Sequence, residues 1–170
     1  MARLVIPIQI RWSDVDGYQH VNNAKMFTLL EEARITAFWA STPGDAEFAG
    51  AGGSGDISAT DAPDAPGTKI LATGPGSGTN TFIARQEIEY LAPLPYTLRP
   101  IEVELWISHL GGASIDVCYE VAGPDGPSAR AMTTLVLVDE KTGKPRRMTD
   151  DERAAWEVYR DEPVAFRRRS

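Results

Sequence analysis

The second half of the chain is dominated by stretches in which apolar and polar residues alternate. Residues 101–108, IEVELWIS, carry an apolar side chain at every second position, and residues 82–91 and 114–121 follow the same pattern. A period of two is typical of a β-strand with one buried face. A fourth run, at 131–138, is apolar on both faces, which predicts a strand in the middle of the sheet.

The connections between these stretches are short and rich in turn-forming residues. HLGGA and GPDGPS separate the last three runs, which favours antiparallel neighbours. We therefore expect the four strands to form a meander. A further strand is predicted at residues 4–12, LVIPIQIRW, and Pro7 indicates that it lies at an edge because proline cannot donate to a ladder.

One long helix is predicted between the first strand and the others. Residues 24–40 place apolar side chains at spacings of three and four, which is typical of an amphipathic helix. The predicted apolar face consists of Phe27, Leu30, Ala33, Ala37 and Phe38. Asn22 or Asn23 is suited to cap its first turn. A long helix followed by an antiparallel sheet indicates the α+β class.

Two other segments complete the predicted organisation. Residues 41–80 hold nine of the fifteen glycines and four of the twelve prolines, which predicts a long flexible loop, with room for a short strand at KILAT, 69–73. Thr149 and Glu152 have the spacing of a capping box, so a short helix is expected at about 149–160. We expect residues 1–170 to form a single domain.

Composition excludes several classes of protein. The net charge of -7 argues against nucleic-acid binding, because phosphate neutralisation needs clustered Lys and Arg. No apolar run is long enough to span a bilayer and the opening segment is too short and polar for a signal peptide, so we expect no membrane and a cytoplasmic location. Cys118, the single cysteine, excludes an intramolecular disulfide and a Cys-rich zinc site, and we expect it to be buried.

The stretch WSDVDGYQHVNNAKM, residues 12–26, concentrates polar groups between the first strand and the helix. DVDG begins like a calcium loop, but counting from Asp14 places Gln19 at the position that requires Gly and Lys25 at the position of the bidentate Glu. Asp14, Asp16 and His20 are acceptable ligands for a transition metal, yet no second histidine supports them nearby. We therefore expect no metal.

Two further interpretations of this stretch are a phosphatase site and a purely structural role. The motif resembles the DxDG motif of haloacid-dehalogenase phosphatases, but Tyr18 stands where that family has Thr, and the phosphatase fold needs repeated βαβ units. A purely structural interpretation assigns the Asp and Asn residues to turns and helix capping, which is how most such clusters behave.

The segment IRWSDVDGYQHVNNAKMFTLLEEAR resembles the start of the hotdog-fold acyl-CoA thioesterases of the 4-hydroxybenzoyl-CoA thioesterase type, which read as a strand, D-x-D, H-V-N-N and a helix with E-x-A-R. The likeness continues in IEYLAPLPY, WISHLGGASIDVCYEV and ARAMTTLVLVDEKTGKPRRM, and leaves the Gly-rich loop unmatched. It implies an antiparallel sheet wrapped around one long central helix. It also implies a homodimer or a dimer-based tetramer with active sites at the subunit interface.

The resemblance also implies an activity and roles for named residues. It implies hydrolysis of acyl-CoA thioesters without a cofactor, since coenzyme A enters as part of the substrate. Asp16 is then the general base or the nucleophile, and the backbone amide of Asn23 stabilises the oxyanion. His20 is expected to orient Asp16 or to contact substrate.

Substrate contacts are predicted for Gln19, Phe27, Tyr90 and Arg85, and three further arginines are candidates. Phe27 and Tyr90 are expected to line the acyl group, and Arg85 is a candidate for the coenzyme A phosphates, together with Arg130, Arg146 and Arg147. Gln19 replaces a Gly common in the family, so it either changes the loop or touches substrate. The alternatives are a hotdog protein that binds acyl-CoA or an acyl carrier without hydrolysis, and a DxD-type phosphatase.

Overall fold

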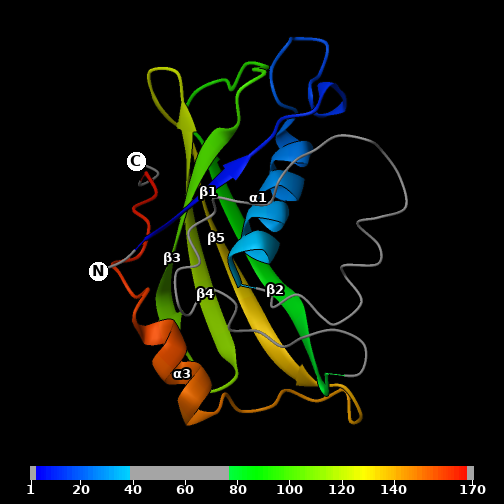
Figure 1. Cartoon of the computed structure of the whole chain (residues 1–170), viewed down its shortest axis with the longest axis vertical. Helices are drawn as coiled ribbons and strands as arrows, with labels where there is room; N and C mark the ends of the chain where they lie inside the picture. Colours follow the sequence, from blue (N-terminus) through cyan, green and yellow to red (C-terminus); the bar gives the residue numbers. More distant parts are fainter. Residues whose placement is uncertain (1–2, 39–76, 168–170) are drawn as a thin grey trace, which may run out of the picture.

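The computed structural model describes residues 3–38 and 77–167. Its elements are β1 (Leu4–Ile8), the 3-10 helix η1 (Trp12–Asp14), α1 (Asn23–Phe38), β2 (Thr79–Tyr90), β3 (Ile101–Leu110), β4 (Ser114–Gly123), β5 (Gly126–Asp139) and α3 (Asp150–Glu157). Figure 1 shows α1 against one face of the sheet and α3 at one end of it. The KILAT prediction and nearly all of the predicted Gly-rich loop lie outside the described residues, although Thr79 and Asn80 belong to β2.

The five strands form one antiparallel sheet in the order β1-β3-β4-β5-β2. The predicted meander is correct for β3, β4 and β5 but wrong for β2, which pairs with β5 and not with β3. The reason lies in the connection between β2 and β3: residues 91–100 contain three prolines and form no tight hairpin turn. The central position of β5 and the edge position of β1, which contains Pro7, are confirmed.

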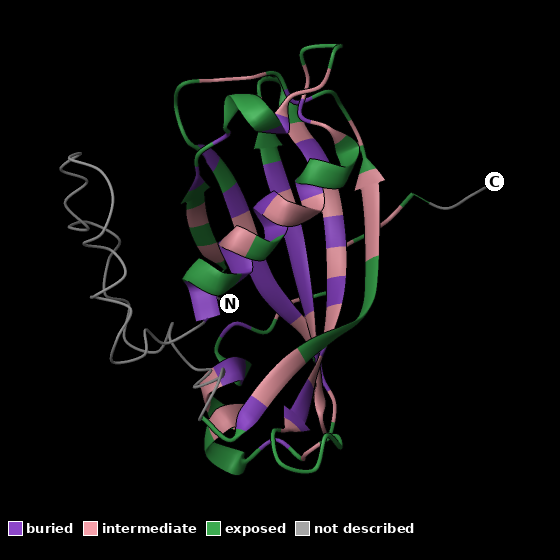
Figure 2. Ribbon diagram, turned by 90° about the vertical axis from the view of Figure 1, so that its right-hand side faces the viewer, coloured by how far each residue is buried: buried purple, intermediate pink, exposed green. Residues whose placement is uncertain are grey.

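Helix α1 fills the concave side of the sheet (Figure 2). Its buried residues are Met26, Leu29, Leu30, Ala33, Arg34, Ala37 and Phe38. The predicted face is confirmed: Leu30, Ala33, Ala37 and Phe38 are buried, and Phe27 is partly buried and packs against the core. Met26 and Leu29, which lie beside the predicted residues, widen the buried face of the helix.

Arg34 is a charged side chain within this core. It is 3% exposed, and its Nη1 donates to the Tyr119 hydroxyl on β4 at 3.1 Å. Its Nη2 lies 3.8 Å from the Glu31 carboxylate. A buried charge is costly unless it is paired, and Glu31 on the same helix supplies a negative partner, while the hydrogen bond to Tyr119 fixes the rotation of α1 against β4.

The short helix α3 begins as predicted. The Thr149 hydroxyl accepts from the Glu152 amide at 3.2 Å, and the Glu152 carboxylate accepts from the Thr149 amide at 2.8 Å, so the capping box is confirmed. Trp156 of α3 is fully buried and meets the Phe38 ring edge to face at a centroid distance of 4.6 Å. These contacts attach α3 to the end of α1.

The chain after α3 runs along the face of the sheet opposite α1. Arg160 forms a parallel bridge with Ile107 of β3, and the Trp106 indole donates to the Glu162 carbonyl at 2.7 Å. Cys118 is buried beneath this segment, as predicted, and burial raises the pKa of its thiol. Among the described helices, none combines the length and the apolar character needed to cross a bilayer.

Candidate active site

Residues 15–21 form a tight loop between η1 and α1. Val15 and Val21 make an antiparallel bridge at its base. The Asp16 amide donates to the His20 carbonyl at 2.9 Å, and the Gln19 amide donates to the Asp16 carbonyl at 3.0 Å. The two bonds fix the backbone on both sides of Asp16.

Gln19 occupies the fourth position of this turn with a φ of 64°. A left-handed backbone costs a residue with a Cβ atom about 1–2 kcal/mol, whereas glycine adopts it freely. The first alternative for Gln19, a changed loop, is therefore not what the structure has, because the backbone takes the conformation that a glycine would favour. Its contact with substrate stays a prediction.

The Asp16 side chain is half-buried, and one of its two carboxylate oxygens accepts a hydrogen bond within the loop. Its Oδ1 accepts from the Tyr18 amide at 2.8 Å, which closes a small turn within the loop. Among the described residues, no donor binds Oδ2. One carboxylate oxygen therefore holds the loop, and the other is available to an incoming molecule.

Asp14 has a different environment. It is 1% exposed, and its carboxylate accepts from the Arg11 amide at 2.8 Å, from Arg11 Nε at 3.1 Å and from Arg11 Nη2 at 3.1 Å. Burial raises the pKa of Asp14, but the hydrogen bonds and charge of Arg11 outweigh burial, so its pKa lies below the ordinary value. Arg11 also lies 3.1 Å from Glu32 on α1. Asp14 thus anchors the loop to the helix.

Replacing Asp14 by Asn is expected to lower the free energy of unfolding by about 1.5 kcal/mol at neutral pH, the lower end for charged hydrogen bonds, because Arg11 is half exposed. The folded pKa lies below the unfolded value of 3.8, so this stabilisation is complete above that value and disappears as the pH falls through the folded pKa. Urea unfolding at pH 7 and at about pH 3 measures the difference. Glu102→Gln, at an exposed carboxylate on β3, is the control. An equal difference between wild type and Asp14→Asn at both pH values would contradict this role.

The start of α1 supplies the second part of the site. Asn22 caps the helix: its Oδ1 accepts from the Ala24 amide at 2.9 Å, and its carbonyl accepts from the Met26 amide at 3.0 Å. The Asn23 amide has no acceptor within residues 3–38 and 77–167. An unpaired amide at a helix N-terminus is a natural donor to an anion, and the helix dipole adds partial positive charge.

Tyr90 is brought to the same place from β2. Its hydroxyl donates to the Asn23 carbonyl at 2.6 Å, and burial raises its pKa. Arg85 is not brought there, because it lies five residues earlier on the same extended strand, about 16 Å from Tyr90. It donates to Glu87 at 2.8 Å. Asp16, His20, Asn23 and Tyr90 therefore gather at one end of α1, with Phe27 one turn further along the helix.

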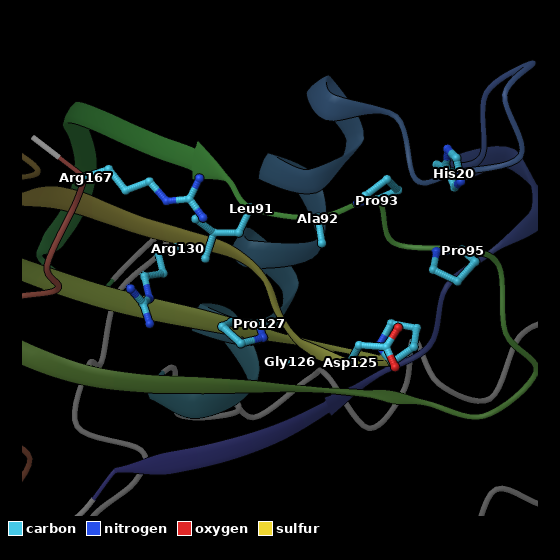
Figure 3. A pocket seen from close by; sticks show the side chains of 11 residues that line it. His20, Leu91, Ala92, Pro93, Pro95, Asp125, Gly126, Pro127, Arg130 and Arg167 are labelled. Carbon is cyan, nitrogen blue, oxygen red and sulfur yellow. The ribbon is translucent and has the colours of Figure 1, made fainter. Parts of the chain in front are cut away.

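A pocket of about 540 Å³ opens beside His20. Its walls come from residues 91–95, from residues 124–127 around the hairpin that joins β4 to β5, and from the C-terminal segment, residues 158–167 (Figure 3). Two arginines, Arg130 and Arg167, also line it. Arg130 is one of the four arginines that the sequence suggests for the coenzyme A phosphates. Arg167 is not among them, because no local sequence pattern connects the C-terminal segment with His20. Among the described residues, no three His, Cys, Asp or Glu side chains are grouped to hold a metal.

An antiparallel sheet that curves around one long helix is the hotdog fold. Here the loop that carries Asp16 leads into that helix. The family model described as the thioesterase-like superfamily matches residues 10–156, so the chain belongs to this superfamily. No curated protein matches the sequence. The fold and its class are therefore as the sequence predicted, whereas the specific 4-hydroxybenzoyl-CoA type is not established.

Solved structures share this fold at low sequence identity. A predicted thioesterase from Bacillus stearothermophilus has a TM-score of 0.68 and 21% identity, over 96% of this chain and all of that one. A thioesterase from Thermus thermophilus, complexed with coenzyme A and Zn, has a TM-score of 0.62 and 19% identity, over 91% of this chain and 92% of that one. A DHNA-CoA thioesterase from Staphylococcus aureus has a TM-score of 0.64 and 16% identity, over 93% and 91%.

Proposed function

We propose that this protein hydrolyses acyl-CoA thioesters. The observation that carries the proposal is that two groups in and beside the loop before α1 have no partner among the described residues: the Oδ2 oxygen of Asp16 and the amide of Asn23. Membership of the thioesterase-like superfamily supports thioester hydrolysis in general. A structural relative from Thermus thermophilus with coenzyme A bound supports coenzyme A as the carrier.

In the proposed reaction, Asp16 acts on the thioester carbonyl carbon. It either removes a proton from a water molecule that attacks this carbon, or attacks it directly to form an anhydride that water then hydrolyses. In both routes a C–O bond forms, the carbonyl oxygen becomes an oxyanion, and the Asn23 amide donates to it. The C–S bond then breaks, the coenzyme A thiolate leaves and takes up a proton, and the free acid remains.

We further propose that the protein acts as a homodimer, or as a tetramer built from such dimers. Strand β2 lies at an edge of the sheet, and its consecutive residues Phe82 and Ile83, whose side chains point to opposite faces, are 57% and 43% exposed. An unpaired edge strand with exposed apolar side chains is a template for pairing with a second chain. Because Tyr90 at the end of β2 contacts Asn23, such pairing places the partner beside the candidate active site.

The two alternatives make different predictions. The phosphatase needs parallel strands in βαβ units, and every strand pair in the observed sheet is antiparallel, so we do not pursue it. A binding protein without catalysis would share the fold and the pocket. Such a binding protein would hold acyl-CoA without hydrolysing it.

A thiol-release assay on the purified protein tests the proposed function. Short, medium, long and aromatic acyl-CoA esters are each supplied, and free coenzyme A is measured with a thiol reagent. Hydrolysis of at least one ester class above the uncatalysed rate is expected. Binding of the same esters by calorimetry without thiol release would instead identify a binding protein, and phosphate release from phosphomonoesters would revive the phosphatase.

A further inference from the structure

The pocket beside His20 has two chemically distinct ends (Figure 3). At one end lie His20 and Pro95, whose backbones form an antiparallel bridge. At the other end lie the guanidinium groups of Arg130 on β5 and Arg167 on the C-terminal segment. The wall between them consists mainly of small and apolar residues: Leu91, Ala92, Pro93, Pro124, Gly126 and Pro127.

Neighbouring carboxylates hold the two arginines. Arg130 Nε donates to Glu120 at 2.8 Å, and its Nη1 reaches the Ala165 carbonyl at 3.5 Å. The Arg167 amide lies 3.3 Å from both carboxylate oxygens of Glu89. Glu89 and Glu120 are the strand partners of Arg130 on either side, so the contacts of three strands fix its position.

The side chains that line the pocket at this end are positive, and their carboxylate partners Glu89 and Glu120 are not part of the lining. Among the described residues, Asp125 on the β4–β5 hairpin is the one carboxylate that lines the pocket, against two guanidinium groups. Arg130 and Arg167 keep 32% and 72% of their side-chain surface exposed, so both remain accessible to a ligand. The planar guanidinium fork matches phosphate oxygens better than any other side chain.

The opposite end of the pocket lies at His20, in the loop that carries Asp16. The His20 carbonyl accepts from the Asp16 amide, so the residue that lines the pocket is bonded directly to the residue proposed to do the chemistry. A ligand with phosphates at the arginine end and a reactive group near His20 is a long molecule. Its middle section lies against a mainly apolar wall.

We propose that Arg130 and Arg167 bind the phosphates of the 3′-phosphorylated ADP part of coenzyme A, with the pantetheine arm directed past His20 toward Asp16. This assignment rests on the proposed thioesterase function and makes it more specific. An acyl group on a carrier protein is attached through phosphopantetheine alone and lacks the nucleotide. The pocket therefore favours free acyl-CoA over an acylated carrier protein.

Steady-state kinetics with matched substrates tests this assignment. The Arg130→Gln and Arg167→Gln variants are each expected to raise KM for acyl-CoA about tenfold, the effect of losing one charged hydrogen bond. KM for the same acyl group on pantetheine, which carries no phosphate, is expected to stay unchanged, as is kcat for both substrates. Arg160→Gln, in the same C-terminal segment and paired with Glu157, is the matched control.

Glu89→Gln separates phosphate binding from a purely structural role. If Arg167 serves only to fix the C-terminal segment, removing its carboxylate partner should impair the enzyme as Arg167→Gln does. If Arg167 binds phosphate, removal of the nearby negative charge should leave KM for acyl-CoA unchanged or lower it. A rise in KM for Glu89→Gln, or an equal rise for acyl-CoA and acyl-pantetheine in the arginine variants, would overturn the assignment.

Direct binding keeps the test independent of hydrolysis. Calorimetry with adenosine 3′,5′-bisphosphate is expected to detect binding to the wild type and weaker binding, by about tenfold, to each arginine variant. Inorganic phosphate is the comparison ligand, and equal binding of both would indicate a general anion site and contradict a nucleotide site. If no thioester is hydrolysed but the bisphosphate binds through both arginines, the proposed function fails while this site stands. If the wild type does not bind the bisphosphate, the site is overturned.

Discussion

Replacing Asp16 by Asn is expected to lower kcat for the best acyl-CoA ester by about 10² to 10⁴, with little change in KM. Asparagine keeps the size of the side chain and retains an oxygen that can accept from the Tyr18 amide, as Oδ1 does now at 2.8 Å. It cannot accept a proton from water and is a poor nucleophile. Thiol release from the purified variant measures the effect.

Asp14→Asn is the control for this substitution. Both variants lose one carboxylate from the same D-x-D motif, but Asp14 is buried against Arg11 and does not face the open side of the loop. The folded Asp14→Asn protein should therefore keep most of its turnover below its melting temperature. An Asp16→Asn protein that is as active as wild type would refute both routes of the proposed reaction.

Replacing Phe82 and Ile83 together by Lys is expected to convert the assembly to monomers. Both side chains are exposed on the edge strand β2, and in a β2–β2 pair whose two-fold axis passes near them the lysines of one copy would lie close to those of the other and repel them. Light scattering should then report a mass of 18.5 kDa, whereas the wild type should show at least twice this mass. Thiol release should fall together with the dimer fraction.

The opposite edge of the sheet provides the matched control. Val5 on β1 is 49% exposed, so Val5→Lys adds a lysine to the other edge strand, and each single variant, Phe82→Lys or Ile83→Lys, is its match in charge. The Val5→Lys variant is expected to keep the mass and the activity of the wild type. A wild-type protein with a mass of 18.5 kDa at assay concentrations would remove the interface model, whatever the variants do.

The sequence predicted those features that depend on neighbouring residues. The alternation in β3 and β4, the cap at Asn22 and the capping box at Thr149 are all set by contacts within a few residues. Local hydrogen bonding and the pleat of a strand suffice to determine them. The family resemblance then connected these pieces into one fold.

Other features depend on contacts between distant residues and could not be predicted in this way. The place of β2 beside β5 follows from sheet pairing between distant parts of the chain. Arg34 looks like a surface residue in the sequence, and only its contact with Tyr119 accounts for its burial. Arg167 likewise joins the pocket through packing of the C-terminal segment, 37 residues after Arg130.

The two edge strands of the sheet differ in their capacity for backbone hydrogen bonding, because β1 contains Pro7. It removes one backbone donor from β1, so that strand is a poor template for a further chain, whereas the described part of β2 contains no proline. Two copies that join through β2 by a two-fold axis leave only the proline-bearing strands at the ends of the combined sheet. In the proposed dimer, growth would therefore stop at a closed pair instead of continuing into a filament, and a single residue far from the candidate active site would limit the assembly.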